Sequence, residues 1–292
     1  MPNTYAHYRF GDKCINTLPG DLREKIINNR KVYDYGVHGP DIFFYYKVLK
    51  HNYVNDFGHD FHEKPYEEVI IRFKKEFFKI ADKDAAIAYI LGFTAHFVLD
   101  SYCHSYVEIK EEKTTEEGNR ASHGRIETQF DKYLIMKDGL NPFKYSASST
   151  LHPRKATAEV IDALIPNYDA KTIYKCLKDQ KLYVGLLKDS NFIKRWLIET
   201  ACDLTNSSSF KDLMFTTKSY PEIEDALLRL EKLFNKAVEH YNYLATNVID
   251  YILKDEPLDP YFKNNFSVKK DYKSIPVLSV NVENNYEVDF QN

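Results

Sequence analysis

The sequence predicts an all-α fold: a single multi-helix domain at residues 1–254, followed by a short irregular tail at residues 255–292. Two observations predict this class. Apolar residues recur every three or four positions along most of the chain, which is the spacing that gives a helix one buried face. Segments in which apolar and polar residues alternate, as they do in β-strands, occur only in the tail, at residues 277–282 and 286–290. We expect the tail to pack on the domain or to be partly disordered.

The first half of the chain leads to one strongly apolar segment. We expect helices at residues 20–29, 41–49, 65–81 and 84–109. The second of these begins directly after Gly39 and Pro40, a common combination where a turn precedes a helix. The fourth is apolar on nearly all sides, so we expect it to be the central and buried helix of the domain.

The second half of the chain alternates helices with polar connections. Residues 110–119 are charged and have no apolar anchor, which predicts an exposed loop or a frayed helix end. Ser122 is a suitable N-cap for the helix that follows. The last helix is long and amphipathic, and Pro257 and Pro260 come soon after it. The helices expected here span residues 122–136, 155–165, 171–187, 191–204 and 221–253.

Composition and charge narrow the class of function. The 292 residues are 43% hydrophobic and 28% charged, which is typical of a folded globular protein. The formal net charge of −3 argues against a stable nucleic-acid partner, because proteins that bind nucleic acids usually carry a basic stripe. The four cysteines are widely spaced and form no CxxC motif, so we expect them to be reduced thiols.

Targeting and membrane segments are not predicted. The first residues lack the basic and apolar regions of a signal peptide, so we expect a cytoplasmic protein. The longest apolar run, residues 85–99, contains Thr94 and His96. It falls short of the roughly 18 apolar residues that span a bilayer, so we expect no transmembrane segment. The oligomeric state is left open.

A stripe of potential metal ligands runs along the expected central helix. His96, Asp100 and His104 are four residues apart, so all three project along one slowly drifting line. His123 and Glu127 repeat this spacing on the next helix. One such pair is usually a salt bridge or a hydrogen-bonded core pair. Three linked occurrences, one of them in an apolar context, favour a zinc site, because histidine nitrogens and carboxylates are zinc ligands and a metal removes the cost of burying them.

Together with other motifs, this pattern resembles the zinc-dependent phospholipase C family, whose fold is shared by the S1/P1-type nucleases. The resemblance covers about residues 2–250 and is closest to short bacterial members. Better-known members have a slightly longer gap between the bridging aspartate and the next histidine. The motifs in chain order are YAHYRFG around His7, GVHGPDIFFY with Asp41, GHDFH ending at His62, HxxxDxxxH from His96 to His104, and HxxxE from His123 to Glu127.

The resemblance implies up to three zinc ions, whose ligands follow from matching positions. Asp100 would bridge two of the ions. His59 competes with His62 for one ligand position, and the family spacing favours His62. The implied ligands are Asp41, His62, His96 and Asp100 for the first ion, His104, His123 and Glu127 for the second, and His7 and Asp100 for the third.

The third ion would take one more ligand from the start of the chain. In the family this ion also binds the amine of the mature N-terminal residue, which in the nuclease branch lies five residues before the histidine. Here Pro2 lies five residues before His7, and an initiator Met that precedes Pro is normally removed. The resemblance therefore implies that Pro2 becomes the N-terminal residue and that its amine binds the third zinc.

The activity implied by the resemblance is hydrolysis of a phosphodiester, most similar to that of phospholipase C. A hydroxide that bridges two zinc ions would attack phosphorus. Asp100 would bridge these ions, and Asp41 would act as a ligand or, in addition, as the general base. The acidic segment at residues 108–117 disfavours polyanions, so we expect a phospholipid headgroup or a small phosphodiester as substrate. The alternatives are an S1/P1-like single-strand nuclease and a non-catalytic metal-binding helical protein. Members of the family are often secreted, so secretion stays open.

Overall fold

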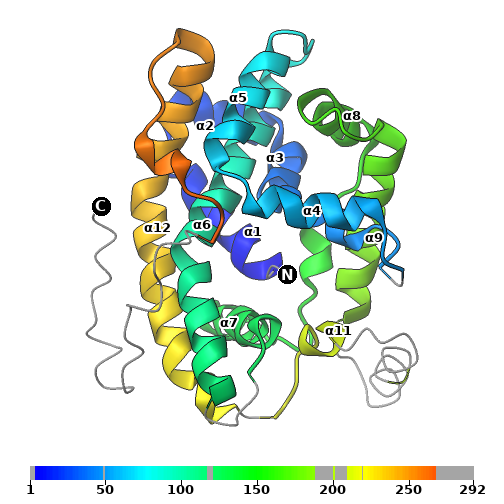
Figure 1. Ribbon diagram of the computed structural model, residues 1–292, viewed down its shortest axis with the longest axis vertical. Coiled ribbons are helices and arrows are strands. Elements are labelled where there is room, and N and C mark those ends of the chain that lie inside the picture. The colour runs from blue at the N-terminus through cyan, green and yellow to red at the C-terminus, as the bar shows by residue number, and fades with distance from the viewer. Residues whose placement is uncertain are drawn as a thin grey trace.

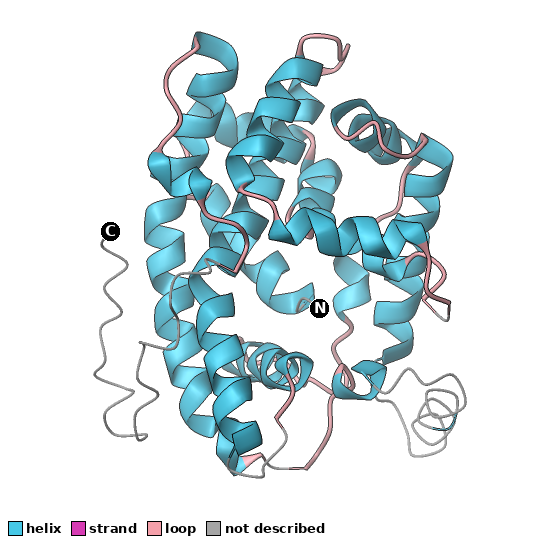
Figure 2. Cartoon of the chain, viewed as in Figure 1, coloured by secondary structure: helices cyan, strands magenta, loops and turns pink. Residues whose placement is uncertain are grey.

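The computed structural model describes residues 4–48, 50–116, 121–187, 200, 209–218 and 220–267. Figure 2 shows these residues as helices and loops, and no strand occurs among them, so the predicted all-α class is confirmed. In chain order the elements are α1 (Thr4–Ile15), α2 (Gly20–Asn28), α3 (Arg30–Gly36), η1 (Gly39–Tyr45), α4 (Tyr53–Glu63), α5 (Tyr66–Phe77), α6 (Lys83–Glu116), α7 (His123–Lys137), η2 (Ala147–Thr150), α8 (Lys155–Leu164), α9 (Ala170–Leu187), α11 (Ser209–Asp212), α12 (Pro221–Lys254) and η3 (Pro260–Lys263).

The long helix α6 is the centre of the fold. It packs against α3, α12, α2 and α1. Figure 1 shows α1 near the middle of the molecule, with α12 along one side and α8 and α9 along the other. By length and composition alone α6 would be able to cross a membrane, but its apolar stretch is entirely buried inside the protein. That burial is what the central helix of a folded domain requires.

Buried tyrosines join the central helices to one another. The Tyr33 hydroxyl of α3 donates a hydrogen bond to the Gly11 carbonyl of α1 at 2.8 Å. The Tyr241 hydroxyl of α12 donates to the Leu91 carbonyl of α6 at 2.9 Å. Each ring buries a large apolar area while its hydroxyl keeps a partner, which is the arrangement that makes a buried tyrosine favourable. The core is therefore bonded across helices as well as packed.

The helices α3 and α6 approach so closely that only glycine fits at their contact. A Cβ atom on Gly92 would lie 2.5 Å from the Tyr33 carbonyl oxygen, and one on Gly36 would lie 2.6 Å from the Tyr89 carbonyl oxygen. Backbone atoms cannot turn aside as the end of a flexible side chain can. This contact sets the position of η1, which begins just after α3, relative to α6.

Most of the predicted helices are confirmed, with ends that shift by a few residues. Ser122 caps α7 as expected, because its hydroxyl accepts a hydrogen bond from the Arg125 amide at 3.2 Å. Cys14, Cys103 and Cys176 are buried free thiols, as expected. The confirmed helices are those at residues 20–29, 65–81, 84–109, 122–136, 155–165, 171–187 and 221–253. The helix at 191–204 and the strand-like segments at 277–282 and 286–290 lie outside the described residues, except for residue 200.

One helix prediction was wrong. The helix expected at residues 41–49 is a 3-10 helix, η1, that ends at Tyr45. It stops there because the Asn55 side-chain amide donates to the carbonyls of Phe43, Phe44 and Tyr46, and because Lys47 has a left-handed φ of 47°.

The segment at residues 110–119, expected to be an exposed loop or a frayed helix end, is the end of a helix as far as Glu116, since α6 continues to that residue. Lys110 anchors this stretch through an ion pair instead of an apolar contact. Its amine lies 2.6 Å from the Asp225 carboxylate of α12, and both side chains are buried. Residues 117–120 lie outside the described part of the chain.

The first part of the tail packs on the helical body. Phe262 and Phe266 are fully buried. The Phe266 ring lies 5.0 Å from the His62 ring and 5.7 Å from the His96 ring, measured between centroids. The domain boundary at residue 254 stays a prediction, although residues 255–267 lie against the domain rather than apart from it.

Replacing Gly92 with Ala tests the close contact of α3 with α6. The added methyl group would clash with backbone, so we expect the free energy of unfolding to fall by about 1–3 kcal/mol, as for overpacked cores. Urea denaturation measures this change. Gly20→Ala is the matched control, because a Cβ at Gly20 meets nothing within 4 Å. Equal stability of the two variants would show that the contact is not restrictive.

Candidate metal centre

Five segments supply the candidate ligands, and they meet at the middle of α6. Pro2 lies outside the described residues. The others form three neighbouring groups in which the potential ligand atoms lie within 4.8 Å of one another. The groups are His7, His96 and Asp100; Asp41, His62 and His96; and His104, His123 and Glu127. Residues from α1, η1, α4, α6 and α7 thus lie together, although His7 and Glu127 are far apart in the sequence.

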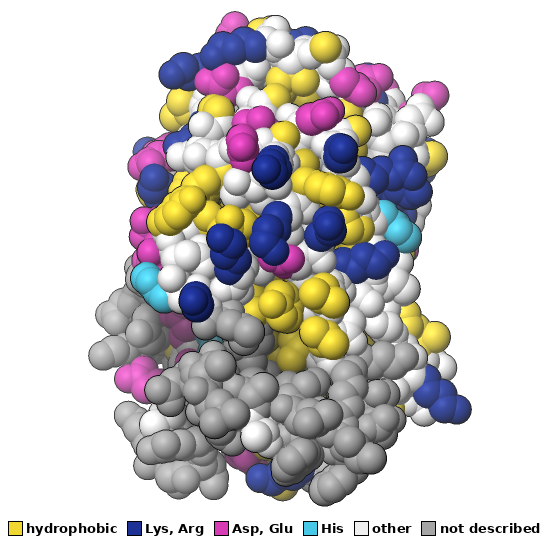
Figure 3. All heavy atoms as spheres, turned by 90° about the vertical axis from the view of Figure 1, so that its right-hand side faces the viewer, with side chains coloured by type: hydrophobic (Ala, Val, Ile, Leu, Met, Phe, Trp, Pro, Cys, Tyr) yellow, Lys and Arg dark blue, Asp and Glu magenta, His cyan; other side chains and the backbone are white. Residues whose placement is uncertain are grey.

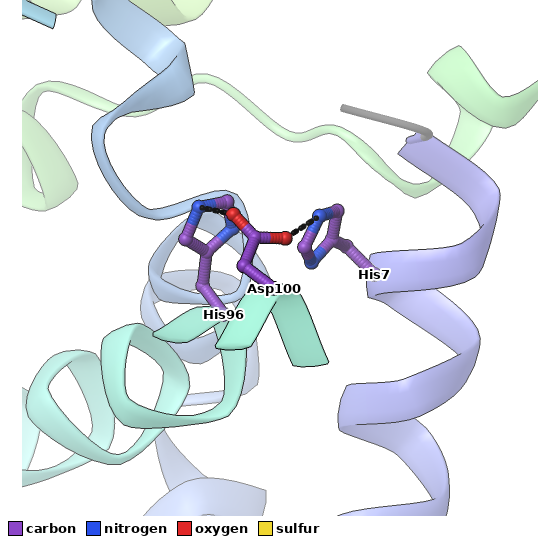
Figure 4. A group of neighbouring side chains, drawn as sticks. All are labelled: His7, His96 and Asp100. Carbon is purple, nitrogen blue, oxygen red and sulfur yellow. Dashed lines mark ion pairs between the residues drawn. The ribbon is translucent and has the colours of Figure 1, made fainter. Parts of the chain in front are cut away.

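Asp100 lies at the centre of these groups, and its two carboxylate oxygens face different ligands. Its Oδ2 atom is 3.1 Å from His96 Nε2. Its Oδ1 atom is 3.2 Å from His7 Nε2 and 3.5 Å from His104 Nε2. Figure 4 shows the carboxylate between the imidazoles of His96, on the same helix, and His7, on α1. This is the arrangement that a carboxylate bridging two ions needs.

In the group around Asp41, two histidine rings lie beside the aspartate carboxylate. His62 Nε2 lies 3.1 Å from Asp41 Oδ1, and His96 Nδ1 lies 3.7 Å from Asp41 Oδ2. The other ring nitrogen of His62, Nδ1, is 2.7 Å from the Gly58 carbonyl and can donate to it. Such a bond fixes the tautomer and leaves Nε2 free for a metal, as is usual for histidine ligands.

The third group is the most accessible one. His104 Nε2 and His123 Nε2 lie 3.3 Å and 3.0 Å from Glu127 Oε1. The side chain of His123 is 25% exposed and that of His104 is 14% exposed, whereas His7 and His96 are almost completely buried. A ligand from solution therefore has its clearest approach at this group, among the residues that the structure describes.

The donor atoms fit zinc. Asp41 Oδ2, His96 Nε2 and Asp100 Oδ2 are buried and make no well-aligned hydrogen bond among the described residues, although the last two atoms lie 3.1 Å apart. Leaving such atoms unpaired is costly, and a cation bound by them removes the cost. A set of imidazole nitrogens and carboxylate oxygens is the set that zinc binds.

The pKa shifts of the side chains in the centre also fit a site for a bound cation. Burial alone would raise the pKa of Asp100, but the charges of the three imidazoles around it outweigh burial and hold that pKa well below its ordinary value. Burial lowers the pKa of His104, yet Asp100 and Glu127 raise it more, to about 9. Protons thus balance the buried carboxylates here, and a metal cation would replace them.

The structure separates the two competing histidines. His62 faces Asp41, as described above. His59 is exposed, and its ring lies on Phe44 with 4.5 Å between centroids. Among the described residues only His62 belongs to one of the three ligand groups. The position favoured by the spacing is therefore the one that points into the centre.

Gly39 allows the η1 segment to pass directly over His96. Its φ of 48° is left-handed, and a Cβ atom there would lie 2.3 Å from His96 Cδ2. Any side chain at this position would push the imidazole out of place. The glycine of the Gly39-Pro40 turn is thus required by the metal centre as well as by the turn.

His38 is a buried histidine that the ligand pattern did not place. It is 1% exposed, and neither ring nitrogen has a hydrogen-bond partner among the described residues. Burial, followed by the charge of His7, lowers its pKa to about 3, so its ring is neutral. It belongs to none of the three ligand groups.

Asp131 holds α1 against α7 and was missed by sequence reasoning. Its carboxylate accepts hydrogen bonds from the backbone amides of Tyr5, at 3.0 Å, and Ala6, at 2.7 Å. Burial raises its pKa to about 7 despite these bonds. The two amides belong to the first turn of α1, so Asp131 positions His7, whose ring stacks on that of His96 with 4.3 Å between centroids. The sequence did contain a signal for Asp131: it lies four residues after Glu127, just as Glu127 lies four residues after His123.

Comparison with known proteins gives one match. Residues 6–208 match the family model described as zinc dependent phospholipase C. The match includes all eight candidate ligands that the structure describes, from His7 to Glu127. No curated protein and no solved structure matches the chain.

Replacing Asp131 with Ala tests its role as the anchor of α1. The first turn of α1 would lose the carboxylate that accepts its two amides, so we expect a loss of about 1–2 kcal/mol in the free energy of unfolding, as for a lost helix cap. We also expect weaker binding of the zinc held by His7, measured by titrating a zinc indicator against the protein. Asp60→Ala, at an exposed position on α4, is the control. An unchanged zinc titration for Asp131→Ala would rule out the anchoring role.

Proposed function

The chain belongs to the zinc-dependent phospholipase C family, and we propose that it hydrolyses a phosphodiester bond of a phospholipid-type substrate at the centre around Asp100. The family consists of zinc-dependent hydrolases, which makes zinc the cofactor. The observation that carries the proposal is the position of Asp100. One carboxylate oxygen faces His96 and the other faces His7 and His104, so this side chain is shared by the neighbouring ligand groups.

The proposed ligands divide into three sets. They are Asp41, His62, His96 and Asp100 for the first ion, His104, His123 and Glu127 for the second, and His7, Asp100 and the Pro2 amine for the third. The distances within the three groups support these sets. Bound zinc ions would supply a lowered pKa for the attacking water and positive charge for the phosphoryl oxygens.

The protein side chains would orient the reacting groups. Asp100 would hold two ions at a fixed separation. The Gly58 carbonyl would hold the His62 ring in one tautomer. Asp41 is proposed first as a ligand. Its Oδ2 atom, buried without a hydrogen-bond partner among the described residues, would be able in addition to accept a proton from the attacking water.

The substrate class rests on the family and on charge. A phosphodiester is common to phospholipids and nucleic acids, so the ligand set by itself selects neither. The family favours a phospholipid-type substrate. The acidic residues near the end of α6, which include Glu108, Glu111 and Glu112, disfavour the approach of a polyanion.

Assays of the zinc-loaded protein distinguish the proposed function from its two alternatives. The substrates are bis-p-nitrophenyl phosphate, phosphatidylcholine and single-stranded DNA. Hydrolysis of DNA alone would indicate a nuclease, and bound zinc without any turnover would indicate a binding protein.

Asp100→Asn tests the proposed bridge. The amide would be a weak zinc ligand and would remove the charge that balances two ions, so we expect fewer zinc ions per chain and a loss of turnover of about 100-fold or more. Elemental analysis and the phosphodiesterase assay measure the two effects. Asp60→Asn makes the same chemical change at an exposed site and should alter neither. Full zinc content and full turnover in Asp100→Asn would refute the proposed centre.

Two experiments on the start of the chain test whether the Pro2 amine is a zinc ligand. We expect intact-mass analysis of active protein to show that Met1 is absent. A short extension before Pro2 should then lower the zinc content by about one ion per chain, because the amine is displaced. The same extension placed at the C-terminus is the control. Active protein that retains Met1, or an N-terminal extension without any effect on zinc, would contradict this assignment.

A further inference from the structure

The outer side of α9 carries a stripe of exposed side chains that the metal centre does not use. The stripe follows helical steps of four, three, four and four residues, so its members lie on one face. Lysines form its first part and leucines its last part. The members are Lys171, Lys175, Lys178, Leu182 and Leu186, all of them exposed.

The charge on this face is almost entirely positive. The only carboxylate of α9 is Asp179, which is buried and accepts hydrogen bonds from the Lys175 amine at 2.6 and 2.9 Å. Asp162 and Asp169 precede the helix and accept bonds from backbone amides of its first residues. Lysine charges further along the helix are therefore not balanced by α9 itself, in a chain whose net charge is −3.

Basic residues of other segments extend this face. The amines of Lys47 and Lys175 both lie over the Tyr46 ring, 5.1 and 5.9 Å from its centroid. Burial and the charges of Lys181, Lys31 and Arg154 lower the pKa of His152, so each of these three basic groups lies within electrostatic range of His152. Figure 3 shows Lys and Arg side chains gathered on the side of the molecule that carries α8 and α9, next to a hydrophobic patch.

The leucines at the end of the stripe are exposed to water. Leu182 is 55% exposed and Leu186 is 43% exposed, and they lie one turn apart. The inner side of the same helix is held in the fold, because Ile173 and Leu177 are fully buried. The outer face is thus presented by a helix whose position is fixed. Adjacent apolar side chains exposed beside a charged rim are typical of an interaction site.

We propose that this face of α9 docks the protein on an anionic phospholipid surface. The lysines would lie at the lipid headgroups, and Leu182 and Leu186 would enter the boundary between headgroups and acyl chains, as the two faces of interfacial helices do. A nucleic acid would also attract the lysines, but it offers no hydrocarbon in which the leucines become buried. The pairing of lysines with leucines therefore favours lipid.

The inner side of α9 borders helices that carry candidate metal ligands. Val184 and Leu187, on another side of α9, line a cavity of about 60 Å³ that Thr4, Tyr45 and Asp131 also line. Thr4 and Asp131 belong to the helices that carry His7 and Glu127. The helix that carries the docking face is therefore also packed beside two of the helices that carry proposed ligands. The proposal does not depend on turnover, since binding to lipid can be measured without it.

Sedimentation with vesicles tests the proposal on the zinc-loaded full chain. The vesicles contain phosphatidylcholine alone or with about 30% phosphatidylserine, and lipid phosphorus in the supernatant is measured to correct for hydrolysis. We expect stronger partition onto the anionic vesicles. Lys178→Glu combined with Leu182→Ser should weaken this partition at least tenfold, because each lysine near an anionic surface contributes about fivefold and the leucine adds to that.

The chain offers a matched control and a second variant. Arg23→Glu with Ile27→Ser changes one exposed basic and one exposed apolar residue at the same spacing on α2, and it should leave partition within about twofold of the original. Lys171→Glu with Leu186→Ser, two further members of the stripe, should repeat the loss seen for the first pair. Zinc content and turnover of bis-p-nitrophenyl phosphate should be the same in all variants, which shows that each is folded.

Three results would overturn the docking proposal. The first is equal partition of the unmodified protein onto neutral and anionic vesicles. The second is a loss of partition in the α2 control equal to that in the α9 variants. The third is a loss of single-stranded DNA binding in the α9 variants while their vesicle binding is unchanged. A protein that binds anionic vesicles through α9 but hydrolyses no phosphodiester would overturn the proposed function and leave the docking face intact.

Discussion

The fold depends on one buried carboxylate. Asp100 is buried in the middle of a helix whose first half is almost wholly apolar, and the imidazoles around it hold its pKa well below the ordinary value. Its partners come from different elements: His7 from α1, and His96 and His104 from α6 itself. The surrounding helices are therefore arranged so that imidazoles reach this one side chain, and the ligands of the proposed zinc ions lie in shells around it.

Several features of the backbone serve this arrangement. Gly36 and Gly92 bring α3 close to α6, Gly39 lets η1 pass over the His96 ring, and Asp131 fixes the first turn of α1. None of these residues belongs to a proposed ligand set. They fix how ligand-bearing segments lie against α6 or, for Asp131, how α1 lies against α7, so the precision of the centre comes from the scaffold as much as from the ligands.

The sequence predicts some parts of this structure better than others. The helices α6, α7 and α12 are long or strongly periodic, so their patterns identify them. The helices α1, α3 and α4 were not predicted, because they are short, rich in polar and aromatic residues, and stable only through packing. For the same reason spacing alone pointed to His96, Asp100, His104, His123 and Glu127, whereas His7, Asp41 and His62 were found only through the family resemblance. Gly39 acts on a ring far away in the sequence, and no local pattern reveals that contact, whereas Asp131 continues the four-residue spacing of His123 and Glu127.

The centre also has a consequence for the chain as a polymer. Its described cysteines are free thiols, so no disulfide joins distant segments among them. The proposed ions would link α1, η1, α4, α6 and α7, and would close loops that enclose nearly half of the chain. Such links reduce the conformational freedom of the unfolded state much as disulfides do, but they form and break with the supply of metal rather than with an oxidant. Zinc would then act as a set of reversible crosslinks, and the availability of the ion in the surroundings would govern the lifetime of the folded protein as well as its chemistry.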